Sequence, residues 1–115
     1  MYNMSRIDFF CIRNMLDAID KINGYTSIFQ SADDFYEAAQ SFDATLMNFI
    51  VIGEMVDKLS EELKDTTSSQ LNWFKIKSFR NILAHNYFGV DAEEVWQIIR
   101  GYLPQLKNTL EELIK

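Results

Sequence analysis

The chain has few of the residues that hold metals, form disulfides or interrupt helices. Its 115 residues include one Cys, one His, one Pro and four Gly. With Cys11 alone, no intramolecular disulfide can form, and its apolar neighbours favour a small core residue over a nucleophile. A zinc site needs a cluster of Cys and His, so we expect no metal site and no other cofactor. A Gly-rich phosphate loop and a Gly-x-Ser-x-Gly nucleophile elbow are also absent.

Positive charge is scarce as well. Eleven Lys and Arg against 17 Asp and Glu give a net charge of −6, which argues against a broad surface for a phosphate backbone. Lys75, Lys77 and Arg80 nevertheless fall together just ahead of His85. The sequence therefore allows a local basic site on an acidic body, which would contact few phosphates.

Long apolar segments are missing too. No apolar run reaches the ~18–20 residues of a membrane span, and the first residues lack the basic-then-apolar order of a signal peptide. Together with the lone cysteine, this predicts a cytoplasmic protein that does not contact membranes. The length predicts one domain, residues 1–115.

Helical periodicity and capping residues run through the whole chain, and no segment has the pattern of a strand. Ser5 with Asp8, and Ser31 with Asp34, are typical of helix starts, while Asn23-Gly24 is typical of a helix end. Asn72 is a further cap, and Pro104 must kink the last helix or begin a new segment. The predicted helices cover about residues 5–23, 31–40, 42–63, 73–85 and 92–115. We therefore predict an all-α, up-and-down bundle of four to five helices.

Two details of these helices can be tested. Five apolar residues recur at helical spacing in the first helix and predict its core-facing stripe: Phe9, Ile12, Leu16, Ile19 and Ile22. In the third helix Leu59 and Leu63 are expected on one side with Gly53, and residues 65–70 form a polar loop. A glycine in the interior of a helix lowers the stability of the helix by about 1 kcal/mol relative to Ala, so the presence of Gly53 needs an explanation. Close contact with another helix is favoured over room for a ligand or partner.

The residues that could take part in catalysis lie between Arg80 and Tyr87. Arginine can bind phosphate oxygens in a bidentate manner, and His85 can exchange a proton near neutral pH. Together these two side chains suffice for RNA cleavage without a metal. On one ideal helix Arg80 and Tyr87 lie within about 20° of each other, whereas His85 lies about 140° from Arg80. Either the helix ends near His85, or a second copy completes the site in a dimer whose two helices face each other. A structural role stays open, with His85 at a helix C-terminus and Arg80 paired with an acidic neighbour.

Residues 72–91, Asn-Trp-Phe-Lys-Ile-Lys-Ser-Phe-Arg-Asn-Ile-Leu-Ala-His-Asn-Tyr-Phe-Gly-Val-Asp, resemble the hallmark of HepT-like toxins of the HEPN superfamily of helical ribonucleases. Ile52-Gly53-Glu54 resembles the family's Ile-Gly-Glu segment. Val95-Trp96 and Leu103-Pro104-Gln105-Leu106 resemble its usual ending. The resemblance extends from about Ser5 to Leu113. One departure is Asn86, where members often carry Glu, so a negative charge is missing beside the motif.

The resemblance implies a HEPN-like dimer that cleaves RNA without metal at a cleft shared by two Arg-x4-His-x-Tyr motifs. It also implies a type VII toxin–antitoxin system, in which an MntA-type minimal nucleotidyltransferase antitoxin transfers AMP from ATP to the motif tyrosine. On this basis Arg80 and His85 are catalytic, Asn81 supports the arginine and Tyr87 is the modified residue. Glu54 matches a supporting acidic position whose role is left open.

Two other readings compete with this expected endoribonuclease toxin. In one, the protein is a non-catalytic helical binding subunit of a nucleotidyltransferase complex, and Arg80 binds nucleotide phosphate. In the other, it is a purely structural helical dimer. The sequence leaves the RNA target, the activity of the isolated protein and any higher assembly with the antitoxin undetermined.

Overall fold

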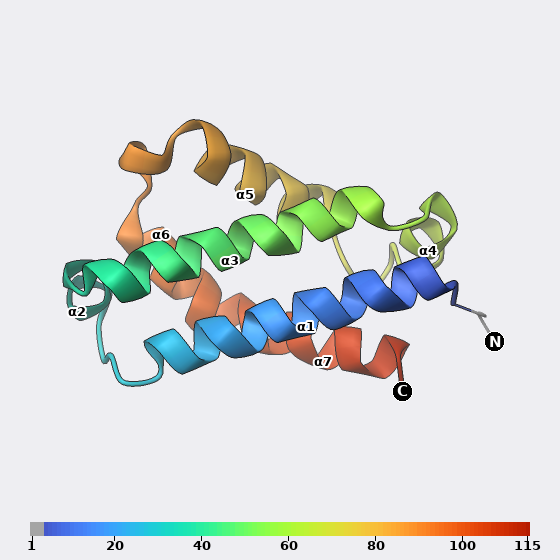
Figure 1. The fold of residues 1–115 in the computed structure, drawn as a ribbon, viewed down its shortest axis with the longest axis horizontal. Helices are drawn as coiled ribbons and strands as arrows, with labels where there is room; N and C mark the ends of the chain where they lie inside the picture. Colours follow the sequence, from blue (N-terminus) through green and yellow to red (C-terminus); the bar gives the residue numbers. More distant parts are fainter. Residues whose placement is uncertain (1–3) are drawn as a thin grey trace.

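The computed structural model describes residues 4–115, and within this range every regular element is a helix (Figure 1). The long helices are α1 (Arg6–Thr26), α3 (Ala39–Lys58), α5 (Trp73–His85) and α7 (Leu103–Leu113). Shorter elements connect them: α2 (Ala32–Glu37), α4 (Glu61–Thr66), the 3-10 helix η1 (Tyr87–Gly89), α6 (Ala92–Gln97) and the π-helix η2 (Ile98–Tyr102). The predicted all-α bundle is confirmed. No helix in the described range is both long and apolar enough to cross a membrane.

The long helix α3 is the centre of the arrangement. It packs against α1 on one side and α5 on the other, and α7 packs against α1 (Figure 1). The core between them is formed by large apolar side chains that are almost completely buried, including Ile12, Met15, Leu46, Ile52, Leu83 and Leu110. This packing leaves α5 covered on the side that faces α3.

The first helix begins as predicted, because the Ser5 side chain accepts a hydrogen bond from the Asp8 backbone N–H at 3.1 Å. The prediction that Phe9 belongs to the core is wrong, since Phe9 is 47% exposed and the neighbouring Asp8 is fully buried. The Asp8 carboxylate accepts hydrogen bonds from the Ser60 backbone N–H at 2.8 Å and the Ser60 hydroxyl at 2.6 Å. These bonds offset the cost of burying a charged group.

The predicted boundaries around α3 are also wrong. The helix breaks at Leu59, whose ψ of 147° is extended, and Ser60 caps α4 by accepting from the Leu63 N–H at 3.1 Å. Because Ser60 is held by Asp8 of α1, the chain forms two helices where periodicity predicts one, and residues 65–66 are helical. At the other end, Ala38 has a non-helical ψ of 78° and separates α2 from α3, so α2 stops before Gln40.

The end of α1 departs from prediction by a few residues. The helix continues through Asn23-Gly24 to Thr26, whose hydroxyl donates to the Ile22 carbonyl at 2.8 Å. A glycine ends a helix most readily when it adopts positive φ, and no glycine among residues 4–115 does so.

The helix that carries the motif matches its predicted bounds. Asn72 caps α5 by accepting from the Lys75 N–H at 3.0 Å, and the helix ends at His85. Of the two predicted effects of Pro104, a kink or a new segment, the structure has the second, because Pro104 lies in the first turn of α7, directly after the π-helix η2. Proline lacks an N–H and clashes with the carbonyl one turn earlier, and the wider π turn accommodates both effects.

Candidate functional site

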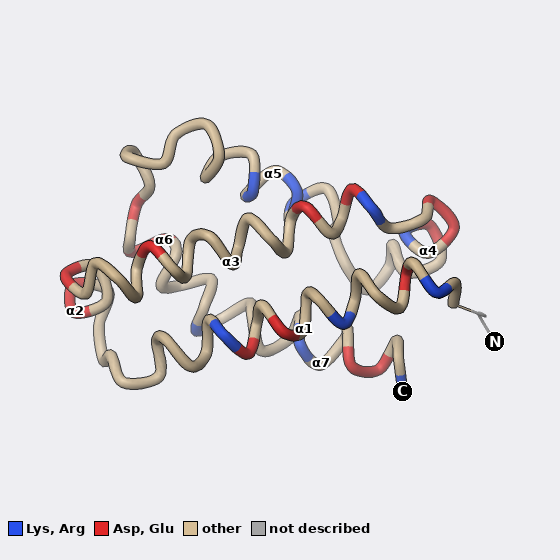
Figure 2. Tube along the Cα trace, viewed as in Figure 1, with Lys and Arg blue, Asp and Glu red and all other residues tan. Residues whose placement is uncertain are grey.

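Polar pairs join α5 to α3 along their antiparallel contact. Lys77 Nζ lies 2.7 Å from Asp57 Oδ1, and Arg80 Nη2 pairs with Glu54 Oε1. Beyond the end of α5, the Tyr87 hydroxyl donates to Asp43 Oδ1 at 2.5 Å. Figure 2 shows the basic residues of α5 next to acidic residues of α3. Two cations of α5, Lys77 and Arg80, are thus paired with carboxylates of α3.

The two helices approach each other closely at Gly53. A Cβ atom added to Gly53 would lie 2.1 Å from Cβ and 2.5 Å from Cγ of Arg80, distances at which atoms overlap. The interpretation of Gly53 as a helix-contact residue is confirmed, and the contact is with the motif arginine itself. The missing side chain at Gly53 therefore makes room for Arg80 of α5 to pack against α3.

The Arg80 guanidinium is fixed by its neighbours in sequence and space. Nη1 donates to Asn81 Oδ1 at 2.7 Å, and Nη2 donates to Glu54. Nε is buried and makes no hydrogen bond to any residue in the described range, and the side chain is only 22% exposed. The structure therefore brings together Arg80, Asn81 and Glu54, and Glu54 is the ion-pair partner of the arginine.

His85 lies on a different side of α5. It is exposed, and it shares the solvent-facing side of the helix with Phe74, which is 80% exposed, and Ile82, which is 56% exposed. We call this side the α5 stripe; at helical spacing it comprises Phe74, Ser78, Asn81, Ile82 and His85. Arg80 instead contacts α3, about 140° around the helix from His85. Within one chain, the two side chains of the expected catalytic pair therefore leave α5 in different directions.

Tyr87 does not share a helix with Arg80, so the prediction that these two residues lie on one helix face is wrong. The helix ends at His85, Asn86 is non-helical with φ −141° and ψ 51°, and Tyr87 begins η1. The two residues are anchored to α3 at Glu54 and Asp43, which are separated by about 16 Å along that helix at 1.5 Å per residue. The helix thus ends at His85, as one of the two alternatives requires, but this end does not turn His85 towards Arg80, so completion of the site by a second copy stays a prediction.

The environment of Tyr87 changes its acidity. The hydrogen bond to Asp43, with smaller contributions from burial and the Asp43 charge, raises the pKa of Tyr87 from 10.0 to about 12. The hydroxyl thus keeps its proton at neutral pH and shares it with a carboxylate.

Sequence reasoning missed Asp43 and Asp57. A signal was present, because Asp43, Glu54 and Asp57 are spaced by eleven and three residues, which places all three on one face of a helix. What could not be read was that the basic helix would lie on this face. Within residues 4–115, no three His, Cys, Asp or Glu side chains gather into a group that could hold a metal ion.

The all-α bundle, with an Arg-x4-His-x-Tyr motif at the end of one helix, agrees with the resemblance to helical ribonucleases of the HEPN superfamily. The sequence profile described as ribonuclease HepT-like matches residues 15–113. The chain therefore belongs to the ribonuclease HepT-like family.

The chain is also similar to proteins of several organisms whose names refer to ribonucleases. A Methanocaldococcus jannaschii protein named "putative RNase" is 32% identical over 104 residues, which are 90% of this chain and 81% of the relative. A longer protein of the same organism, named "gamma-glutamylcyclotransferase and putative RNase", is 30% identical over 104 residues, and this chain spans only 45% of its length. The "probable ribonuclease HepT" of Thermococcus cleftensis is 26% identical over 104 residues, 93% of that protein. No solved structure matches the chain.

Replacement of Gly53 by alanine should destabilise the protein. The added methyl group would overlap Arg80, and overpacking of this kind costs about 1–3 kcal/mol. Gly24→Ala is the matched control, because nothing lies within 4 Å of its added Cβ and alanine in a helix should stabilise by about 0.5–1 kcal/mol. The free energy of unfolding in urea measures both. Equal stabilities of the two variants would contradict the close contact.

Replacement of Asp43 by asparagine should return the pKa of Tyr87 towards 10, from about 12. Since the folded state holds this proton more tightly, the stabilisation is complete below pH 10 and is lost as the pH rises through 12. A pH titration of phenolate absorbance measures the shift, with Asp33→Asn in α2 as the control that leaves the curve unchanged. A curve for Asp43→Asn that coincides with that of the wild type would refute the assignment.

Proposed function

We propose that this protein is a metal-independent endoribonuclease and the toxin of a type VII toxin–antitoxin system. The observation that carries the proposal is the arrangement of Arg80 and His85 on a HepT-like scaffold. Arg80 is positioned by Gly53, Glu54 and Asn81, and His85 ends the same helix with an accessible imidazole.

The two side chains have complementary roles in phosphodiester cleavage. The imidazole of His85 takes the proton of an RNA 2′-hydroxyl or gives a proton to the leaving 5′-oxygen. The guanidinium of Arg80 stabilises the negative charge that grows on the phosphoryl oxygens. Attack of the 2′-oxygen on the adjacent phosphorus leaves a 2′,3′-cyclic phosphate and a 5′-hydroxyl, and no step calls for a metal or another cofactor.

A homodimer would bring the two groups to one phosphate. Arg80 and His85 of one chain leave α5 about 140° apart, so a second chain is the simplest way to join them. The α5 stripe supports this pairing because it exposes Phe74 and Ile82. The hydrogen bond from Arg80 to Asn81, itself a stripe residue, also brings the guanidinium to the edge of the stripe.

The ion pair with Glu54 has a consequence for the substrate. A phosphate that binds Arg80 meets a guanidinium already paired with a carboxylate, so it must share or displace Glu54. We assign Glu54 and Asn81 as supporting residues that orient the arginine, and Arg80 and His85 as the catalytic residues.

Regulation would act through Tyr87. Its hydroxyl is only two residues from His85, half-exposed and bonded to Asp43. A minimal nucleotidyltransferase antitoxin would transfer AMP from ATP to this oxygen, releasing pyrophosphate, while the hydroxyl proton leaves towards Asp43. The added group would bring bulk and negative charge next to His85 and would repel RNA.

Cleavage of RNA by the purified protein in excess EDTA tests the activity. His85→Ala should slow cleavage by about 10²–10⁴-fold, the usual share of proton-transfer catalysis, and Arg80→Ala should also impair it. Asn23→Ala, an exposed residue of α1, is the control that keeps full activity. A folded His85→Ala protein that cuts as fast as the wild type would refute the mechanism, and an inactive wild type would favour a non-catalytic binding subunit of a nucleotidyltransferase complex.

Mass spectrometry after incubation with the antitoxin and ATP tests the regulation separately. The wild type should gain AMP on Tyr87, and Tyr87→Phe should gain none while it continues to cleave RNA. Tyr36→Phe is the matched control, since Tyr36 is 59% exposed and its removal should leave the modification intact. AMP found on another residue would overturn the assignment of Tyr87 and would leave the nuclease assignment standing.

A further inference from the structure

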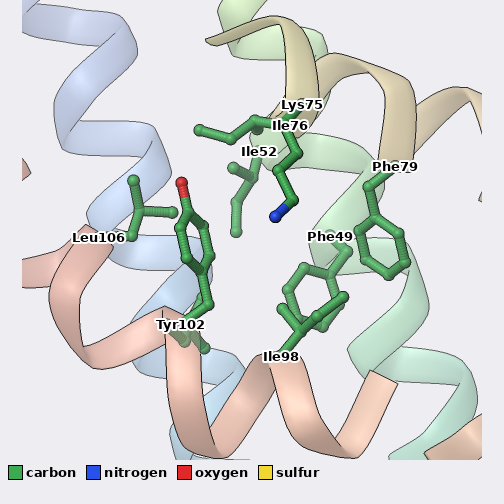
Figure 3. A pocket seen from close by; sticks show the side chains of 9 residues that line it. Phe49, Ile52, Lys75, Ile76, Phe79, Ile98, Tyr102 and Leu106 are labelled. Carbon is green, nitrogen blue, oxygen red and sulfur yellow. The ribbon is translucent and has the colours of Figure 1, made fainter. Parts of the chain in front are cut away.

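An apolar cavity lies between α3, α5, η2 and α7, on a different side of α5 from the α5 stripe. Its volume is about 110 Å³, and its walls are mostly apolar, with Phe49, Ile52, Ile76, Phe79, Ile98 and Leu106 among the lining residues. Figure 3 shows these side chains around an open centre. The hollow is open to solvent on one side, since Lys75 on its wall is exposed, so a ligand could enter it without a change of fold.

One cation reaches into this apolar space. Figure 3 shows the Lys75 side chain entering from α5, with its ammonium group directed between Tyr102 and Phe49. Lys75 forms no ion pair with any residue in the described range, whereas its neighbour Lys77 is paired with Asp57. Lys75 is an exposed residue at the mouth of an apolar hollow, and without a carboxylate partner among residues 4–115 its ammonium group is available to an anion from outside the chain.

The cavity continues into a second, polar hollow. This adjoining space of about 270 Å³ shares Lys75, Tyr102 and Leu106 with the cavity, and apart from Leu71 its other lining residues are polar: Gln70, Asn72, Gln105 and Thr109. Lys75 and Tyr102 therefore stand at the junction of an apolar compartment and a polar one. Burial raises the pKa of Tyr102 above its usual value, so its hydroxyl remains a hydrogen-bond donor at neutral pH.

We propose that this composite cleft binds a small amphiphilic carboxylate, with the apolar body in the cavity and the carboxylate at Lys75 and the Tyr102 hydroxyl. The size of the body follows from the volume, because apolar cavities of about 150 Å³ hold the six carbons of benzene, and about 110 Å³ in proportion fits about four carbons, such as the last four of hexanoate. The sign of the head group follows from the unpaired ammonium. This site stands independently of the proposed nuclease function, since it uses neither Arg80 nor His85.

Hexanoate is the probe, and the isoleucine methyl groups of the intact protein are the readout. In an NMR titration, hexanoate should shift the methyl signals of Ile52, Ile76 and Ile98, which line the cavity. Ile7 and Ile28 are 66% and 77% exposed and serve as internal controls that should not move. Affinity should rise by about fourfold for each added methylene from butyrate to hexanoate.

The role of the Lys75 charge in binding the carboxylate is tested with two further ligands and two variants. Hexylammonium should bind more weakly than hexanoate, and Lys75→Met should weaken hexanoate by about tenfold, the effect of one lost charge-assisted hydrogen bond. The same variant should bind hexanol as the wild type does, which also shows that the cavity is intact. Lys21→Met, which removes an exposed lysine of α1, is the charge-matched control and should bind hexanoate normally.

Three results would overturn the proposal. They are the absence of cavity-methyl shifts with hexanoate, equal shifts of the exposed and cavity isoleucines, and unchanged hexanoate affinity in a Lys75→Met protein that still binds hexanol. Each is measured without RNA, so failure here and failure of the nuclease proposal are distinguishable.

Discussion

The contact between Gly53 of α3 and Arg80 of α5 is the constraint on which the other features of the site depend. Because position 53 carries no side chain, the backbone of α5 lies close to α3 and Arg80 fits against it. At this short distance between the two helices, Glu54 forms an ion pair with the Arg80 guanidinium and Asp57 forms one with Lys77. The same approach covers one side of α5 and leaves the other, with His85, in solvent. The orientation of the helix that carries the motif is thus set by the smallest residue of its partner.

Some of the acidic residues of the chain have a specific structural role in this arrangement. A net charge of −6 gives no general attraction for a polyanion, yet three carboxylates of α3 hold a lysine, an arginine and a tyrosine hydroxyl in fixed places. Fixed donors are more effective than mobile ones in stabilising charge that develops during a reaction. The acidic face of α3 therefore serves as a scaffold for the α5 side chains.

Local signals in the sequence predicted the elements that depend on local chemistry. The caps Ser5 and Asn72, the bounds of α5 and the break at Pro104 were all readable, because each depends on residues within one turn. The break at Leu59 was not readable, because it depends on the bonds between Ser60 and Asp8, which are 52 residues apart. The same bonds explain why Asp8 rather than Phe9 is buried.

In the candidate site, too, the sequence predicted the local features and not those that depend on distant contacts. Sequence alone identified Arg80, His85, Tyr87, Asn81 and Glu54 as residues of interest, and it predicted that Gly53 marks a close helix contact. The predicted end of α5 at His85 is correct, so the ideal-helix estimate that placed Tyr87 on the face of Arg80 fails because Tyr87 lies beyond that end. The partners Asp43 and Asp57 required knowledge of which helix lies beside α3.

The π turn between α6 and α7 holds one residue more than an ordinary α-helical turn. Removal of one residue from Ile98–Tyr102 would therefore leave an ordinary α-helix in which α7 keeps its orientation, with Leu106 and Leu110 still in the core. Natural variants of this protein should accordingly accept a one-residue deletion in this turn, as well as changes of length at residues 68–70, which are exposed between α4 and α5.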